Sequence, residues 1–85
     1  MDEAADKLET IKTREDFVEF TQLLLKNLGE HPEDWENVTL KDYLGAIAAW
    51  TEDMDGYYRN MQLPMPANVD WKVFANILMA ASIYE

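Results

Sequence analysis

The chain has 85 residues, of which 17 are acidic and 7 are basic, so its formal net charge is −10 at pH 7. It contains no cysteine, which excludes disulfide bridges and thiolate metal sites. A net charge of this sign repels nucleic acid and anionic membranes and attracts basic partners. We therefore expect binding neither to nucleic acid nor to a membrane.

The acidic residues are concentrated in the middle of the chain. Residues 30–55 carry eight acidic side chains against a single lysine, so seven of the ten net negative charges lie in this segment. Their field extends over a Debye length of about 10 Å. The charge distribution predicts an acidic surface that meets a basic partner.

Composition indicates one folded domain spanning residues 1–85. The apolar content is 48%, and only three glycines and three prolines are present, which argues against disorder. The apolar runs are far shorter than the ~20 residues of a membrane span. The acidic N-terminus lacks the apolar core of a secretory signal, so a cytoplasmic location is expected.

The first half of the chain predicts two helices. The first runs roughly from Asp2 to Thr10 and is short and acidic. The second begins after Thr13, which forms a capping box with Asp16 in place of the usual glutamate. Gly29 is expected to end this helix in a left-handed conformation. Its apolar residues recur at helical spacing: Phe17, Phe20, Leu24 and Leu28.

A linker from His31 to Asn37 then leads to a third predicted helix. Thr39 and Asp42 repeat the capping pattern, and the segment Asp53–Gly56 is expected to stop the helix. Its apolar residues follow in steps of three and four: Leu40, Tyr43, Ile47, Trp50 and Met54.

The segment Gly56–Asn68 carries two prolines and predicts a long loop, and Asp70 caps the last helix. Only Lys72 and Asn76 give that helix a polar side, so it is expected to be central. The predicted fold is all-α: a compact bundle of three to four helices with a long loop before the last, central helix. Five residues are expected to be nearly inaccessible to solvent: Leu40, Ile47, Trp50, Phe74 and Leu78.

Candidate catalytic and metal-binding residues are few. His31 is the only histidine, and a zinc site needs several ligands. The sequence from Asp53 to Gly56 resembles part of a calcium loop, but no glutamate closes it at the required spacing. Ser82 is the only serine and has no base nearby in sequence. We expect no enzymatic activity, no cofactor and no metal.

Aromatic residues that stand among acids point to a protein interface. Trp35 lies between two acids, and a tyrosine pair follows a second acidic cluster. Aromatic anchors supply affinity and charges accelerate encounter. In the alternative interpretation, the rings cover the small core. The predicted partner-binding residues are Trp35, Glu36, Glu52, Asp53, Asp55, Tyr57 and Tyr58.

Three stretches carry a resemblance to known proteins: W-E-N-x-T-L-x-x-Y-L from Trp35 to Leu44, A-A-W with D-G-Y-Y between Ala48 and Tyr58, and W-K-V-F-A through A-A to Y-E between Trp71 and Glu85. Together they resemble a family of short acidic bacterial proteins of unknown function, over roughly Thr13 to Glu85. The resemblance implies no particular activity.

A looser similarity links the chain to the colicin-nuclease immunity proteins, which are also short, acidic helical bundles. Tyr57 and Tyr58 would match the adjacent tyrosine pair with which that family meets a basic nuclease. The glycine-proline and tryptophan-arginine surroundings of the pair are missing here. The similarity is therefore an analogy of physical properties rather than of ancestry.

The favoured function is a non-enzymatic interaction domain, an inhibitor or immunity-type protein that binds a basic partner. One alternative is a DNA-mimicking inhibitor, whose acids would have to spread along one extended face, whereas clustering favours a compact epitope. A second is a homo-oligomeric accessory domain, such as a homodimer formed through the apolar last helix. A third is a ligand-binding module with the segment Gly56–Asn68 as a lid, which requires a pocket with converging polar groups.

Overall fold

The computed structural model describes residues 2–84, which fold into four α-helices and one short 3-10 helix. The elements are α1 (Asp2–Leu8), α2 (Arg14–Glu30), η1 (Pro32–Asp34), α3 (Leu40–Asn60) and α4 (Trp71–Ala81). No strand occurs within residues 2–84, so the predicted all-α bundle is confirmed. None of the helices in this range combines the length and apolar character that crossing a membrane requires.

The predicted capping box at the start of α2 is present. The Thr13 hydroxyl accepts from the Asp16 amide at 3.1 Å, and the Asp16 carboxylate accepts from the Thr13 amide at 3.2 Å. The same carboxylate accepts from the Lys12 amide at 3.0 Å. The amides of Lys12 and Thr13 favour the ionised form and lower the pKa of Asp16. Local sequence therefore determines where α2 begins.

The predicted caps of the other two long helices are also present. Thr39 accepts from the amide of Asp42 at 3.1 Å at the start of α3. Asp70 accepts from the amide of Val73 at 2.8 Å at the start of α4. Each cap satisfies a backbone donor that would otherwise lack an intrahelical partner.

The predicted helix ends are wrong at both glycines. Helix α2 runs through Gly29 to Glu30, and α3 runs through Gly56 to Asn60. A glycine costs a helix only about 1 kcal/mol. The turn beyond Gly56 buries Tyr58, which favours continuing the helix. The left-handed backbone occurs later, at Gln62 with φ of 57°, and the loop spans residues 61–70.

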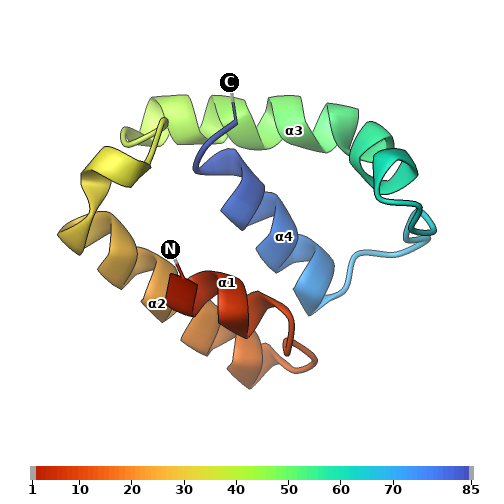
Figure 1. The fold of residues 1–85 in the computed structure, drawn as a ribbon, viewed down its shortest axis with the longest axis horizontal. Helices are drawn as coiled ribbons and strands as arrows, with labels where there is room; N and C mark the ends of the chain where they lie inside the picture. The colour runs from red at the N-terminus through yellow and green to blue at the C-terminus, as the bar shows by residue number, and fades with distance from the viewer. Residues whose placement is uncertain (1, 85) are drawn as a thin grey trace.

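Helix α4 is the central element, as predicted. Figure 1 shows α3 along one side, α1 and α2 along the other, and α4 crossing between them. The backbone of α4 approaches all three other α-helices, whereas α3 packs against α4 alone among them. Because α2 and α3 do not meet, α4 must cover both of them.

Two hydrophobic clusters lie on two sides of α4. The first joins α1, α2 and the 31–39 linker to α4, and its buried members are Ala4, Ile11, Phe20, Leu24, Trp35 and Ala75. The second joins α3 to α4, and its buried members are Trp50, Met54, Tyr58, Val73 and Ile77. The protein therefore has two small cores that share one helix.

Two of the five predicted core residues are exposed, which corrects that prediction. Leu40 is 72% exposed and Phe74 is 43% exposed, whereas Trp50 is 7% exposed. Leu40 lies about 60° around the α3 axis from Tyr43, on the flank of the helix. Phe74 stacks on Phe17 of α2 with ring centroids 5.2 Å apart, and the rest of its ring is left uncovered. Ile47 and Leu78, the other two, are partly buried.

The end of α4 is held by the linker that precedes α3. The Asn37 side-chain amide donates to the carbonyl oxygens of Ala81 and Tyr84, at 2.9 and 2.7 Å. The backbone amides of Glu36 and Asn37 donate to the carbonyl of Ser82, at 3.0 and 3.2 Å. These contacts satisfy carbonyls that a helix end leaves without an intrahelical donor. They also bring the C-terminal residues against α3.

Tyr43 makes a further bond to α4 from within α3. Its hydroxyl donates to the carbonyl of Leu78 at 2.7 Å, and its ring packs on Trp35 with centroids 5.9 Å apart. The Trp35 indole donates in turn to the Asn27 side chain of α2 at 2.7 Å. Through these two aromatic residues α2, α3 and α4 are linked at one end of the bundle.

The two clusters predict unequal costs for the same substitution at two phenylalanines. Phe20→Ala removes a ring that is fully buried, so we expect a loss of about 3–5 kcal/mol in the free energy of unfolding. Phe74→Ala removes a 43% exposed ring, and at most about 2 kcal/mol is expected. Urea denaturation of both variants measures the difference. Equal losses of unfolding free energy in the two variants would contradict the burial of Phe20 and the exposure of Phe74.

The bond from Tyr43 predicts a pH-dependent stability. Burial raises the pKa of Tyr43 to about 12 from its usual 10.0. The pKa of Tyr43 is higher in the folded protein than in the unfolded chain. The stability that the protonated Tyr43 contributes is therefore complete below pH 10 and is lost as the pH rises towards 12. Tyr43→Phe should cost about 1 kcal/mol at pH 8 through the lost hydrogen bond.

The difference in free energy of unfolding between the wild type and Tyr43→Phe should therefore shrink between pH 10 and pH 12. Urea denaturation of both proteins at each pH measures it, and the remaining tyrosines are common to both. A difference that stays constant across this range would show that the Tyr43 hydroxyl is not protected by the fold.

Candidate functional site

The acidic residues predicted to bind a partner are all exposed. Glu52, Asp53 and Asp55 lie on α3, where Asp55 pairs with Arg59 at 3.4 Å. Asp53 accepts from the Tyr84 hydroxyl at 2.5 Å, and this bond raises the pKa of Tyr84. The structure thus places these three acids together near the C-terminal part of α3.

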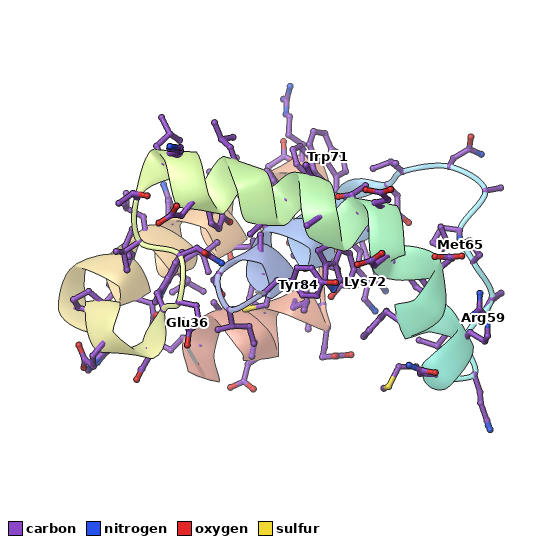
Figure 2. The ribbon with its side chains drawn as sticks, turned by 90° about the horizontal axis from the view of Figure 1, so that it is seen from above. Glu36, Arg59, Met65, Trp71, Lys72 and Tyr84 are labelled. Carbon is purple, nitrogen blue, oxygen red and sulfur yellow. The ribbon has the colours of Figure 1, made fainter. Side chains whose placement is uncertain are left out.

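Glu36 is exposed but lies apart from that cluster. It precedes α3, whereas the predicted tyrosine pair lies in the last turns of the helix. A rise of 1.5 Å per residue separates Leu40 from Tyr57 by about 26 Å. In Figure 2, Glu36 and Arg59 accordingly lie at opposite ends of the molecule. The predicted residues form two separate groups, which contradicts a single compact epitope.

Two of the three predicted aromatic anchors belong to the cores. Trp35 is 9% exposed and Tyr58 is 8% exposed, so the prediction of exposed anchors is wrong for these residues. Both are buried because the two small cores use their aromatic residues to cover α4. Tyr57 is half-buried; its ring lies edge-on to Tyr58 at 5.1 Å and 5.6 Å from Trp50. Tyr57 alone of the three retains accessible surface for a partner.

An apolar groove, which sequence reasoning did not identify, lies between α2 and the first turns of α3. We call it the α2–α3 groove; its volume is about 430 Å³. Leu25 and Leu40 on its walls are 71% and 72% exposed, and Val38 is 51% exposed. The sequence signal was an apolar Leu25 outside the predicted stripe of α2. The lining residues are Thr21, Leu24, Leu25, Leu28, Trp35, Asn37, Val38, Thr39, Leu40, Tyr43 and Leu78.

Three aromatic rings lie near this groove: the partly buried Phe17 of α2 and the exposed Trp71 and Phe74 of α4. Phe17, one helical turn before Thr21, stacks on Phe74 with centroids 5.2 Å apart and contacts Trp71 at 5.3 Å. Phe74 lies one turn before Leu78, which lines the groove. In Figure 2, Trp71 points away from α1, towards the opposite side of the molecule. Partly exposed apolar side chains therefore extend from the groove along α2 and α4.

A second hollow, of about 510 Å³, lies between the 61–70 loop, the end of α3 and α4. Its walls are mostly apolar and include Tyr57 and Tyr58. Its charged and amide side chains are Glu9, Asp70, Lys72 and Asn76. The long loop thus borders a hollow beside α4, but the loop begins at residue 61 rather than at Gly56 and the walls of the hollow are mostly apolar.

Residues considered for metal binding and catalysis lie in different settings. His31, Glu33 and Asp34 are exposed, and one ligand atom from each lies within 4.8 Å of the others. The calcium-loop resemblance fails because Asp53–Gly56 is helical rather than a loop. Ser82 is fully buried and donates to the Met79 carbonyl at 2.7 Å. A buried serine bonded to a backbone carbonyl is a structural residue.

A protein-family model matches residues 13–85, and its description is a family of unknown function, DUF7660. The chain belongs to this family. No curated protein and no solved structure matches the chain. Within the family's span, residues 35–43 contain the side chains that hold the end of α4. Of the W-E-N and Y-L motifs, Trp35, Asn37 and Tyr43 are thus engaged in packing or hydrogen bonds, whereas the side chains of Glu36 and Leu44 are exposed.

The burial of the tyrosine pair predicts different effects for its two members. Tyr58→Ala removes a ring that is 8% exposed and should lower the free energy of unfolding by about 3–5 kcal/mol. Tyr57→Ala removes a half-buried ring and should cost less. Thermal melting of both variants gives the comparison. A Tyr58→Ala protein that melts like the wild type would restore this residue as an exposed anchor.

Proposed function

We propose that the protein is a non-enzymatic interaction domain that binds a basic protein partner. One observation carries this proposal: all eight acidic side chains of residues 30–55 are exposed. Within residues 2–84, only Asp55 of these eight lies within ion-pair distance of a lysine or arginine. The negative charge of this segment is therefore directed at solvent and is not neutralised within the fold.

An unpaired acidic surface acts mainly on the rate of association. Complementary potentials steer a basic partner towards the surface before contact, and salt weakens the effect. Glu52 and Asp53 are exposed on α3, so a partner can approach them, and Asp53 also accepts a hydrogen bond from Tyr84. The half-buried ring of Tyr57 lies one turn beyond Asp53 and can supply apolar contact.

A protein partner fits the acids better than the DNA-mimicking alternative does. A DNA mimic needs carboxylates spaced along one extended face, as phosphates are along a strand. Here neighbouring acids such as Glu52 and Asp53 point about 100° apart around the helix axis. They surround part of α3 rather than follow one line along it.

The proposal extends to an inhibitor or immunity-type role in a bacterial cytoplasm. The acidic helical bundle supports the analogy to colicin-nuclease immunity proteins. The burial of Tyr58 weakens it, because a buried ring cannot meet a nuclease as the tyrosine pair of that family does. We therefore base the role on charge rather than on the tyrosines.

Removing acids from α3 should slow binding of the partner. The test uses the basic protein recovered by affinity purification from the native host. Neutralising Glu52, Asp53 and Asp55 to the matching amides should lower the association rate about tenfold at low salt. The reduction should become smaller as salt is added, because screening weakens the wild-type attraction too.

A matched control removes three exposed acids elsewhere: Asp6→Asn, Glu9→Gln and Glu15→Gln. It has the same net charge as the α3 variant, and its association rate should remain close to that of the wild type. Stopped-flow or surface-based kinetics measure both variants. Equal rates for the wild type and the α3 variant at low salt would refute the proposed function.

A further inference from the structure

The α2–α3 groove is an apolar surface on a highly charged molecule. None of its eleven lining residues is charged, although the chain has a net charge of −10. Three of its apolar members, Leu25, Val38 and Leu40, are between 51% and 72% exposed. Contiguous exposed apolar surface on a protein of this kind typically marks a binding site.

We propose that this groove binds an amphipathic helix of the basic partner. The inference rests on the proposed function, because the charge of the protein selects the occupant. The inference specifies which part of the partner supplies affinity. The apolar side chains of the partner helix would enter the groove, and its lysine or arginine side chains would face the surrounding acids.

The walls of the groove favour a helical occupant. They are formed by α2 on one side and by the linker residues 35–39 with the first turn of α3 on the other, and Leu78 of α4 lies between them. No strand edge occurs within residues 2–84, so the groove has no backbone ladder to pair with an extended peptide. A segment entering an apolar groove must satisfy its own backbone groups, and a helix does so internally.

The charges around the groove favour a basic helix over a second copy of this chain. Exposed Glu36 and Asp42 adjoin the lining residues Trp35 and Tyr43 in sequence, against a single exposed base, Lys41, which adjoins Leu40. Lys26 pairs with Glu3 of α1 at 3.8 Å and lines a different hollow with it. Two chains of net charge −10 repel each other, whereas a cationic helix is attracted.

Acids on α3 can meet the polar face of such a helix. One side of α3 carries residues spaced by four, seven and four positions along the helix: Leu40, Leu44, Thr51 and Asp55. Leu44 is 55% exposed and continues the apolar wall towards Asp55. A partner helix in the groove would therefore meet apolar residues first and a carboxylate further along α3.

The test uses a synthetic 15-residue peptide of leucine and lysine, with the leucines at helical spacing. A scrambled peptide of the same composition has the same charge but no apolar face. In ¹⁵N-resolved NMR titrations, the amphipathic peptide should bind at least tenfold more tightly than the scrambled one. Its shifts should concentrate at residues 21–28 and 35–43 and at the Trp35 indole.

Groove variants give the second arm of the test. Leu40→Glu should weaken binding of the amphipathic peptide at least tenfold, and Leu25→Gln should weaken it without changing net charge. Both residues are more than two-thirds exposed, so the fold should persist. Val69→Glu is the matched control: its site is 70% exposed, lies in the 61–70 loop outside the groove, and gains the same charge. It should bind as the wild type does.

Two results would overturn the groove proposal. The first is equal binding of both peptides, or binding unaffected by Leu40→Glu. The second is a dimer in sedimentation experiments that Leu40→Glu dissociates, since a second copy would then occupy the groove. In the first case the proposed function still stands if neutralising the α3 acids slows association with the native partner. If that slowing is absent too, both proposals fail.

Discussion

The structure depends on α4, an eleven-residue helix that must cover two other parts of the molecule at once. One side packs against α1 and α2, and another packs against α3. A helix with only two clearly polar positions can do this, because apolar residues surround most of its axis. The cost is that α2 and α3 are left apart, and the side of α4 between them remains open. Both the two-core architecture and the α2–α3 groove follow from this constraint.

The end of α4 needs partners that its own sequence does not provide. Carbonyl groups in the last turn of a helix have no intrahelical donors. Here they receive hydrogen bonds from Tyr43, from Asn37 and from the amide of Glu36. The linker before α3 is therefore not a passive connection. It closes the bundle at the end where α3 and α4 meet, and it places the groove beside that junction.

The first residues of the helices were predictable because capping hydrogen bonds depend on nearby residues. The last residues of α2 and α3 depend on packing against distant parts of the chain. Thr13, Thr39 and Asp70 act on amides a few residues away, so a short sequence window contains the information. Gly29 and Gly56 also look like local signals, but a helix can continue through glycine at a modest cost when later residues are buried. The burial of Tyr58 depends on α4, which lies far along the chain and is invisible to a local pattern.

The candidate site was predictable in charge and unpredictable in shape. Exposure of the acids follows from the cost of burying unpaired charge, so their number in residues 30–55 was sufficient. The fate of aromatic and leucine residues depends on which helices meet. Trp35 and Leu40 lie five residues apart and are both apolar, yet one is buried and the other is 72% exposed. Trp35 is buried because it bridges α2 and Tyr43, and Leu40 is exposed because no helix covers that flank of α3. On this open flank the exposed Leu40 lies two residues from the exposed Asp42, and a cationic amphipathic helix can use such a neighbourhood of apolar surface and negative charge.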